Sequence, residues 1–80
     1  MRQVRVIADH IWFEGELLPR EQWEAFDLLY GCMEHLPEND GEHILLLGVR
    51  CGFSPGKVQE KPFVFIHQRS IQSILELPEP

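Results

Sequence analysis

The sequence predicts an α+β protein: a small, mainly antiparallel sheet of three or four strands with one long helix packed on one face, in the order ββαββ(α). Three observations predict this fold. Apolar residues alternate with other residues near the N-terminus, residues 19–36 have helical periodicity, and two short, strongly apolar segments follow them. The 80 residues are expected to form a single domain, residues 1–80, which buries only about 60% of its unfolded surface.

The N-terminal segment is predicted to form strands. Val4, Val6 and Ala8 fall on one face of an extended chain, with Arg5 among the residues between them. An aromatic and β-branched segment follows, from residue 10 to residue 18. Both Asp9-His10 and Glu14-Gly15 are able to turn the chain, so a hairpin and a bent strand fit equally well.

Residues 19–36 are predicted to form the long helix. Pro19 suits the first turn, where its missing N–H is not needed, and Glu21 and Glu24 lie near the positive end of the helix dipole. Gly31 is expected to weaken the helix by about 1 kcal/mol relative to Ala and to allow a close contact. The apolar arc covers about 200° of the helix, wider than one sheet face needs. It contains Trp23, Ala25, Phe26, Leu28, Leu29, Tyr30, Cys32, Met33 and Leu36.

The C-terminal half is predicted to contain two strands, "HILLLGVR" (residues 43–50) and "KPFVFIH" (residues 61–67), each apolar on both faces. Residues 69–77 fit either a short helix capped by Ser70 or a final strand, and the helix is favoured. One helix cannot cover both faces of a sheet. The C-terminal segment or a second copy of the chain, as a homodimer, is therefore expected to cover the other face.

The segment "GVRCGFSPGKV" (residues 48–58) is the nearest approach to a phosphate-binding loop. Cys51 occupies the position where such a loop needs its first glycine, and Val58 replaces the hydroxyl residue that would bind Mg²⁺. Pro55 also removes one N–H donor. Because an apolar strand follows, the segment is predicted to be a hairpin loop, with a type II turn over residues 54–57.

The metal and catalytic signals are weak. Cys32, His35, His43 and Cys51 have a spacing that matches no strong zinc pattern, and Cys32 lies in the apolar arc of the helix. A catalytic pocket is also difficult to build in a domain of this size. We therefore expect no metal, no cofactor and no enzymatic activity.

Charge and hydropathy bear on the partner class. A net charge of -6 argues against direct binding to nucleic-acid phosphates, which needs clustered Lys and Arg. No apolar segment approaches the length of a membrane helix, and the N-terminus lacks a secretory signal pattern. With two cysteines, the sequence predicts a cytoplasmic protein with reduced thiols and no membrane partner.

The acidic residues suggest a contact surface. Glu24, Asp27 and Glu34 share the polar side of the predicted helix, with Glu21 at its edge. Such a face is either simply solvated or meets a basic groove, as a mimic of nucleic-acid charge. More acids surround it in the sequence: Glu14, Glu16, Glu38, Asp40 and Glu42.

The predicted function is a small acidic protein-interaction module, an inhibitor or adaptor whose partner is a protein or protein complex with a basic surface. By class analogy, the partner is a host or defence complex and the module belongs to a phage or mobile element. An apolar flank around Trp12, Leu28 and Phe53 is the alternative contact surface. The predicted partner-binding residues are Glu21, Glu24, Asp27, Glu34, Trp12 and Phe53.

The alternative function is a small homo-oligomer that binds a ligand or metal. Its candidate ligating residues are His10, His35, His43 and His67.

Overall fold

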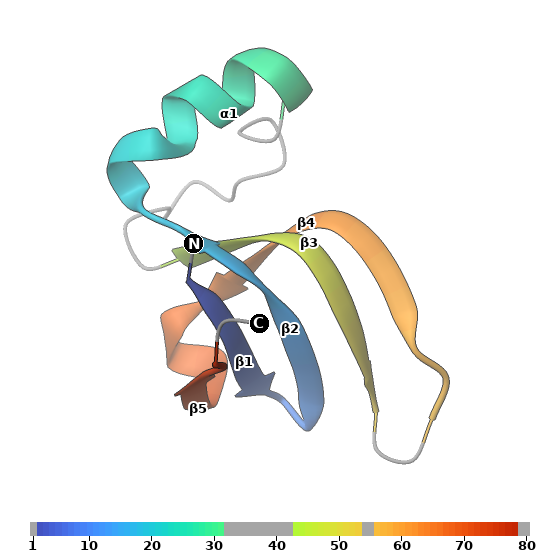
Figure 1. Cartoon of the computed structure of the whole chain (residues 1–80). Helices are drawn as coiled ribbons and strands as arrows, with labels where there is room; N and C mark the ends of the chain where they lie inside the picture. The colour runs from blue at the N-terminus through green and yellow to red at the C-terminus, as the bar shows by residue number, and fades with distance from the viewer. Residues whose placement is uncertain (1, 32–42, 54–55, 79–80) are drawn as a thin grey trace.

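The computed structural model describes residues 2–31, 43–53 and 56–78. Its main body is a five-stranded antiparallel sheet in the order β4-β3-β2-β1-β5, strongly curved along β3 and β4 (Figure 1). A 3-10 turn, η1 (Arg20–Gln22), leads into the helix α1 (Trp23–Tyr30), and a second, η4 (Gln68–Ser70), joins β4 to β5. The strands are β1 (Gln3–Ala8), β2 (Ile11–Leu18), β3 (His43–Phe53), β4 (Gln59–His67) and β5 (Ile71–Glu76).

The expected α+β fold with one long helix is wrong, because the sheet dominates and α1 has only eight residues. The helix ends at Gly31, which adopts the left-handed conformation with φ 62°. The Gly31 N–H donates to the Asp27 carbonyl oxygen at 2.7 Å, a common way to end a helix. Among the described residues, a Cβ added to Gly31 would meet no atom within 4 Å, so no close contact there requires a glycine, whereas its positive φ does. Residues 32–36, expected in the helix, lie outside the described residues.

The favoured C-terminal helix is also wrong. Residues 71–76 form β5, which pairs antiparallel with β1 and places Ile74 opposite Val6. Ser70 does not cap a helix: it ends η4, and the Arg69 N–H donates to His67 Nδ1 at 3.1 Å. β1 pairs with β2 along one edge, and β5 satisfies the backbone groups of its other edge although it is distant in sequence.

The first turn is formed by Asp9-His10, one of the two sequence alternatives. Ala8 pairs with Ile11, so the loop has two residues, and both have positive φ, 51° at Asp9 and 66° at His10. This backbone matches the mirror-image turns that suit the twist of a hairpin.

Glu14-Gly15 instead lies where β2 faces a bulge in β3. Glu14 pairs with Arg50 and Glu16 with Leu47, so β3 has one extra residue there, and Gly48 has φ 57°. A Cβ on Gly15 would lie 2.7 Å from the Leu47 carbonyl oxygen, which only glycine avoids.

Apolar side chains fill both faces of β3. On the concave face, buried residues of three strands form the main core: Val4, Val6, Ala8, Leu46, Val49, Cys51 and Ile66. On the other face, Leu18, Trp23 and Leu45 are buried, with Phe26, Leu47, Phe63 and Phe65 packed against them. The helix therefore covers one face, and the curved sheet covers the other, where Ile71 of the C-terminal segment packs against the core. The expected contribution of the C-terminal segment is thus present, but as part of a strand.

The segment after β3 is a hairpin connection, as predicted. Cys51 pairs antiparallel with Gln59, and the residues that would have to start a helix in a phosphate-binding loop belong to β4. The predicted turn over residues 54–57 lies partly outside the described residues.

Candidate protein-binding surface

The first turn of α1 is fixed to the sheet by Trp23. Its side chain is 3% exposed, and its indole N–H donates to the Leu18 carbonyl oxygen at 3.1 Å. Its ring packs edge-on against Phe65, with 5.3 Å between centroids. The Arg20 guanidinium lies 4.3 Å from the Trp23 ring centroid, in position for a cation–π interaction.

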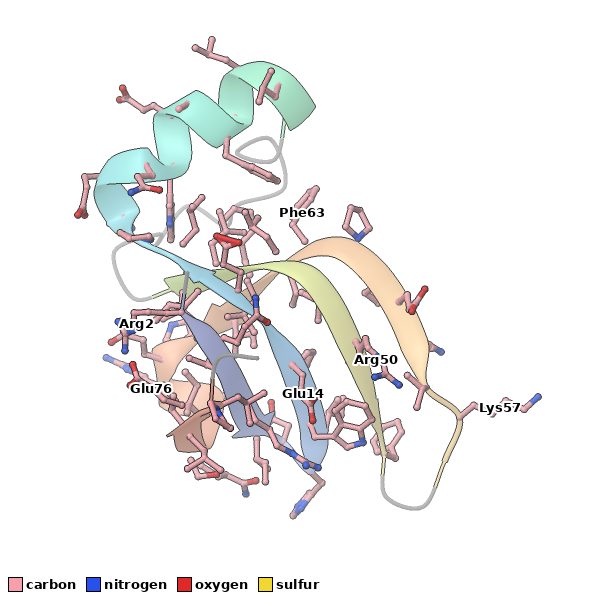
Figure 2. The ribbon with its side chains drawn as sticks, viewed as in Figure 1. Arg2, Glu14, Arg50, Lys57, Phe63 and Glu76 are labelled. Atoms are coloured by element: carbon pink, nitrogen blue, oxygen red, sulfur yellow. The ribbon has the colours of Figure 1, made fainter. Side chains whose placement is uncertain are left out.

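One turn later, Phe26 makes the second contact between helix and sheet. It is half-buried and packs edge-on against Phe63, with 6.1 Å between centroids; Figure 2 shows Phe63 on β4 beneath the helix. Trp23 and Phe26 are three residues apart and so lie on one side of the helix. This stripe is much narrower than the 200° arc expected from the sequence.

Five exposed residues of η1 and α1 lie on the side that points away from the sheet, which we call the outer helix face: Glu21, Glu24, Ala25, Leu28 and Leu29. Leu28 is 88% exposed and Leu29 is 76% exposed. Glu24 lies four residues before Leu28, so a carboxylate and an apolar side chain are neighbours on the helix surface. An apolar helix face flanked by acids fits a groove that is apolar at its floor and basic at its rim.

The predicted acidic residues are only partly brought together. Glu21 and Glu24 lie on the outer helix face, whereas Asp27 is half-buried on its flank. Glu34 lies outside the described residues. On β2, Glu14 is half-buried and its carboxylate is 3.5 Å from the Arg5 guanidinium, so Glu14 belongs to the sheet surface (Figure 2).

Trp12 and Phe53 lie at the opposite end of β2 from the helix. Ile11 pairs with Phe53, and Trp12 pairs with Gly52, so the two aromatic residues are on adjacent strands. Trp12 is half-buried, with the Arg5 guanidinium 5.3 Å from its ring centroid, and Phe53 is 60% exposed. Figure 1 shows α1 and the end of β3 that carries Phe53 far apart, on opposite sides of the molecule. The flank of Trp12, Leu28 and Phe53 is therefore two separate surfaces.

Two of the four candidate histidines form a pair. His43 is buried opposite His67 on β4, and their ring centroids are 4.8 Å apart. A hollow of about 300 Å³ beside them is also lined by Asp9 and Ser70. His10 is exposed in the first turn, and His35 lies outside the described residues.

β3 carries two of the four residues that were considered for zinc and judged a weak signal, His43 and Cys51. Cys51, eight residues after His43, is buried in the concave core, whereas His43 lies opposite His67 beside the hollow. Within residues 2–31, 43–53 and 56–78, no three His, Cys, Asp or Glu side chains are placed to share a metal ion. Cys32 and His35 lie outside those residues.

The sequence placed Leu28 and Leu29 in the apolar arc of a long helix, and it named Leu28 but not Leu29 in the alternative contact surface. The exposure of Leu29 was therefore missed. The signal that could have revealed it is Gly31: a helix that ends there contacts the sheet through one or two turns only.

Comparison with models of known protein families gives no match, and no curated protein matches this chain in sequence. In the described residues, no helix has the length and apolar character needed to cross a membrane.

Proposed function

We propose that this protein is a small protein-interaction module, an inhibitor or adaptor, that inserts its outer helix face into an apolar groove with a basic rim on another protein. The observation that carries the proposal is the exposure of Leu28 (88%) and Leu29 (76%) beside Glu21 and Glu24. Burying a leucine side chain contributes about 1.5–3 kcal/mol. A domain of 80 residues has little stability to spare, so two leucines left in water are well placed to be buried by a partner.

The two kinds of side chain have different roles in this proposal. Leu28 and Leu29 supply the apolar area that holds the complex together. Glu21 and Glu24, on a chain of net charge -6, attract a basic surface and raise the rate of encounter. A mimic of nucleic-acid charge would act through the same carboxylates. By class analogy, we propose that the partner is a host or defence complex and that the module belongs to a phage or mobile element.

The test is quantitative capture from extracts of the cells that encode the protein, followed by mass spectrometry. One variant combines Leu28→Ala with Leu29→Ala, and another combines Glu21→Lys with Glu24→Lys. Val58→Ala is the matched control, because Val58 is also an exposed apolar residue (48%) but precedes β4, away from the helix.

A protein captured by the wild type and by Val58→Ala, and lost with the double leucine variant, is the expected result. The charge-reversed variant should associate with the captured protein more slowly than the wild type. Raising the salt concentration should weaken wild-type capture, because the Debye screening length falls to about 8 Å at physiological ionic strength. Equal capture by the wild type and the double leucine variant would show that the outer helix face does not bind the partner.

A further inference from the structure

We infer that β5 pairs antiparallel with β5 of a second copy of the chain, so that two sheets join across a two-fold axis. This interface is separate from the outer helix face. The inference starts from the two edges of the sheet, β4 and β5, whose outer backbone groups have no strand partner within the described residues.

The β4 edge is protected against pairing. Pro62 lies inside the strand and has no N–H to donate. Glu60 and Lys61 precede it, and all three residues are exposed. Charged residues and proline on an edge strand are the usual means by which proteins prevent edge-to-edge association.

The β5 edge has neither device. From Ile71 to Leu75 the strand contains no charged residue and no proline. Ile74 is 50% exposed and Leu75 is 62% exposed, and as successive residues of a strand they project from opposite faces of the sheet. A strand added beside β5 would therefore cover apolar side chains on both faces while it satisfies the edge backbone.

The charges around β5 favour a second copy as the added strand. Arg69 lies just before the strand and Glu76 ends it, with no charged residue between them. In an antiparallel pair, the start of each strand faces the end of the other, so Arg69 of each copy comes near Glu76 of the other. A parallel pair would bring like charges together.

The antiparallel arrangement also suits the rest of the chain. With a net charge of -6, two copies repel each other least where the meeting segment is uncharged. Glu76 already pairs with Arg2, Nη2 to Oε1 at 2.5 Å, and Figure 2 shows both side chains at the same end of the sheet. Each end of the dimer would then have a carboxylate between two guanidinium groups. One strand pair is a small interface, so the dimer should dissociate on dilution.

The test is sedimentation equilibrium over about a hundredfold range of protein concentration, chosen to span a weak dimer. With increasing concentration, the apparent mass of the wild type should rise from that of one chain, 9.4 kDa, toward twice that mass. Arg69→Glu and Glu76→Lys should each remain at one chain mass, because each places like charges at both ends of the pair. An equimolar mixture of these two variants should dimerise again, since every 69–76 contact then joins opposite charges.

Two further variants complete the test, and circular dichroism checks that all variants are folded. Arg2→Gln removes the contact within the chain but keeps the contacts between copies, and it should still dimerise. Ile74→Lys places a charge on the edge strand and should give one chain mass. It should capture partner proteins as the wild type does, which distinguishes failure of the dimer from failure of the proposed function.

A wild type that stays at one chain mass throughout would overturn the inference. A dimer that persists in Ile74→Lys would place the interface elsewhere, and a mixture that does not dimerise would refute the antiparallel pairing. If the wild type is monomeric and Ile74→Lys alone loses a captured protein, the added strand belongs to another protein and the assignment to a second copy is wrong.

Discussion

Replacing Trp23 tests whether its side chain holds the helix to the sheet. In Trp23→Ala, the loss of a large buried aromatic side chain should cost about 3–5 kcal/mol. The substitution also leaves the Leu18 carbonyl oxygen without its indole donor, 3.1 Å away in the wild type. At about 0.05–0.15 kcal/mol per residue, the whole domain is stable by roughly 4–12 kcal/mol. Trp23→Ala is therefore expected to lose much of the folded population.

Trp23→Phe is the more informative variant, because it keeps an aromatic ring near Phe65 and removes the indole donor. We expect a loss of about 1–3 kcal/mol, which combines the lost hydrogen bond with a smaller side chain. For a domain of this size, each kcal/mol lowers Tm by about 4–8 °C. Leu28→Ala and Leu29→Ala are the matched controls. Their side chains are 88% and 76% exposed, so each substitution should change stability by less than about 0.5 kcal/mol.

The assay is urea denaturation followed by far-ultraviolet circular dichroism, with thermal melts as a second measure. The urea midpoints of the wild type, Leu28→Ala and Leu29→Ala should be about equal and the highest. The midpoint of Trp23→Phe should be lower, and that of Trp23→Ala the lowest. An unchanged midpoint for Trp23→Phe, or a loss for Leu28→Ala as large as that for Trp23→Phe, would refute the assignment of the inner and outer sides of α1.

The remaining predictions concern two glycines and the histidine pair. Gly15→Ala should lower the free energy of unfolding by about 1–3 kcal/mol, because its Cβ would lie 2.7 Å from the Leu47 carbonyl oxygen; an unchanged Tm would contradict this. Gly31→Ala should lower it by about 1–2 kcal/mol, since Gly31 has φ 62°, whereas a continuous helix would be stabilised by the same change. Added zinc should leave Tm unchanged, because no third His, Cys, Asp or Glu of the described residues is placed to share a metal ion with His43 and His67. A stoichiometric zinc ion that is lost in His67→Ala would support the metal-binding alternative.

The elements defined by local pattern were predicted well. The alternation of Val4, Val6 and Ala8 marks a strand with one buried face, and all three are buried. The segment 48–58 joins β3 to β4, as its turn residues indicate. In both places, the residues that determine the structure lie within a few positions of each other.

The wrong predictions depend on long-range context. β5 pairs with residues nearly seventy positions earlier, and a segment such as "IQSIL" has no pattern that excludes a helix until its partner β1 is known. Gly31 can weaken a helix or end one, and the sequence alone did not decide between them. Because the long helix was chosen, Leu29 was assigned only to the apolar arc expected to face the core.

In the candidate site too, local features were predicted from the sequence and features that depend on tertiary structure were not. Glu21 and Glu24 are exposed, in keeping with their assignment to the polar side of the helix, whereas Asp27 is half-buried. The exposure of Leu28 depends on how much of the helix the sheet covers, which is a tertiary property. Glu21, Glu24 and Leu28 were therefore among the contact residues considered from the sequence, but Leu29 was not.

The most direct test of the proposed function is site-specific photocrosslinking in the cells that encode the protein. A photoreactive amino acid replaces Leu28 in one variant and Val58 in another; both positions are exposed, one on the outer helix face and one before β4. We expect a discrete adduct with another protein from position 28 and none from position 58, and Glu21→Lys with Glu24→Lys should reduce its yield. No adduct from position 28, or the same adduct in equal yield from both positions, would contradict a partner bound at the outer helix face.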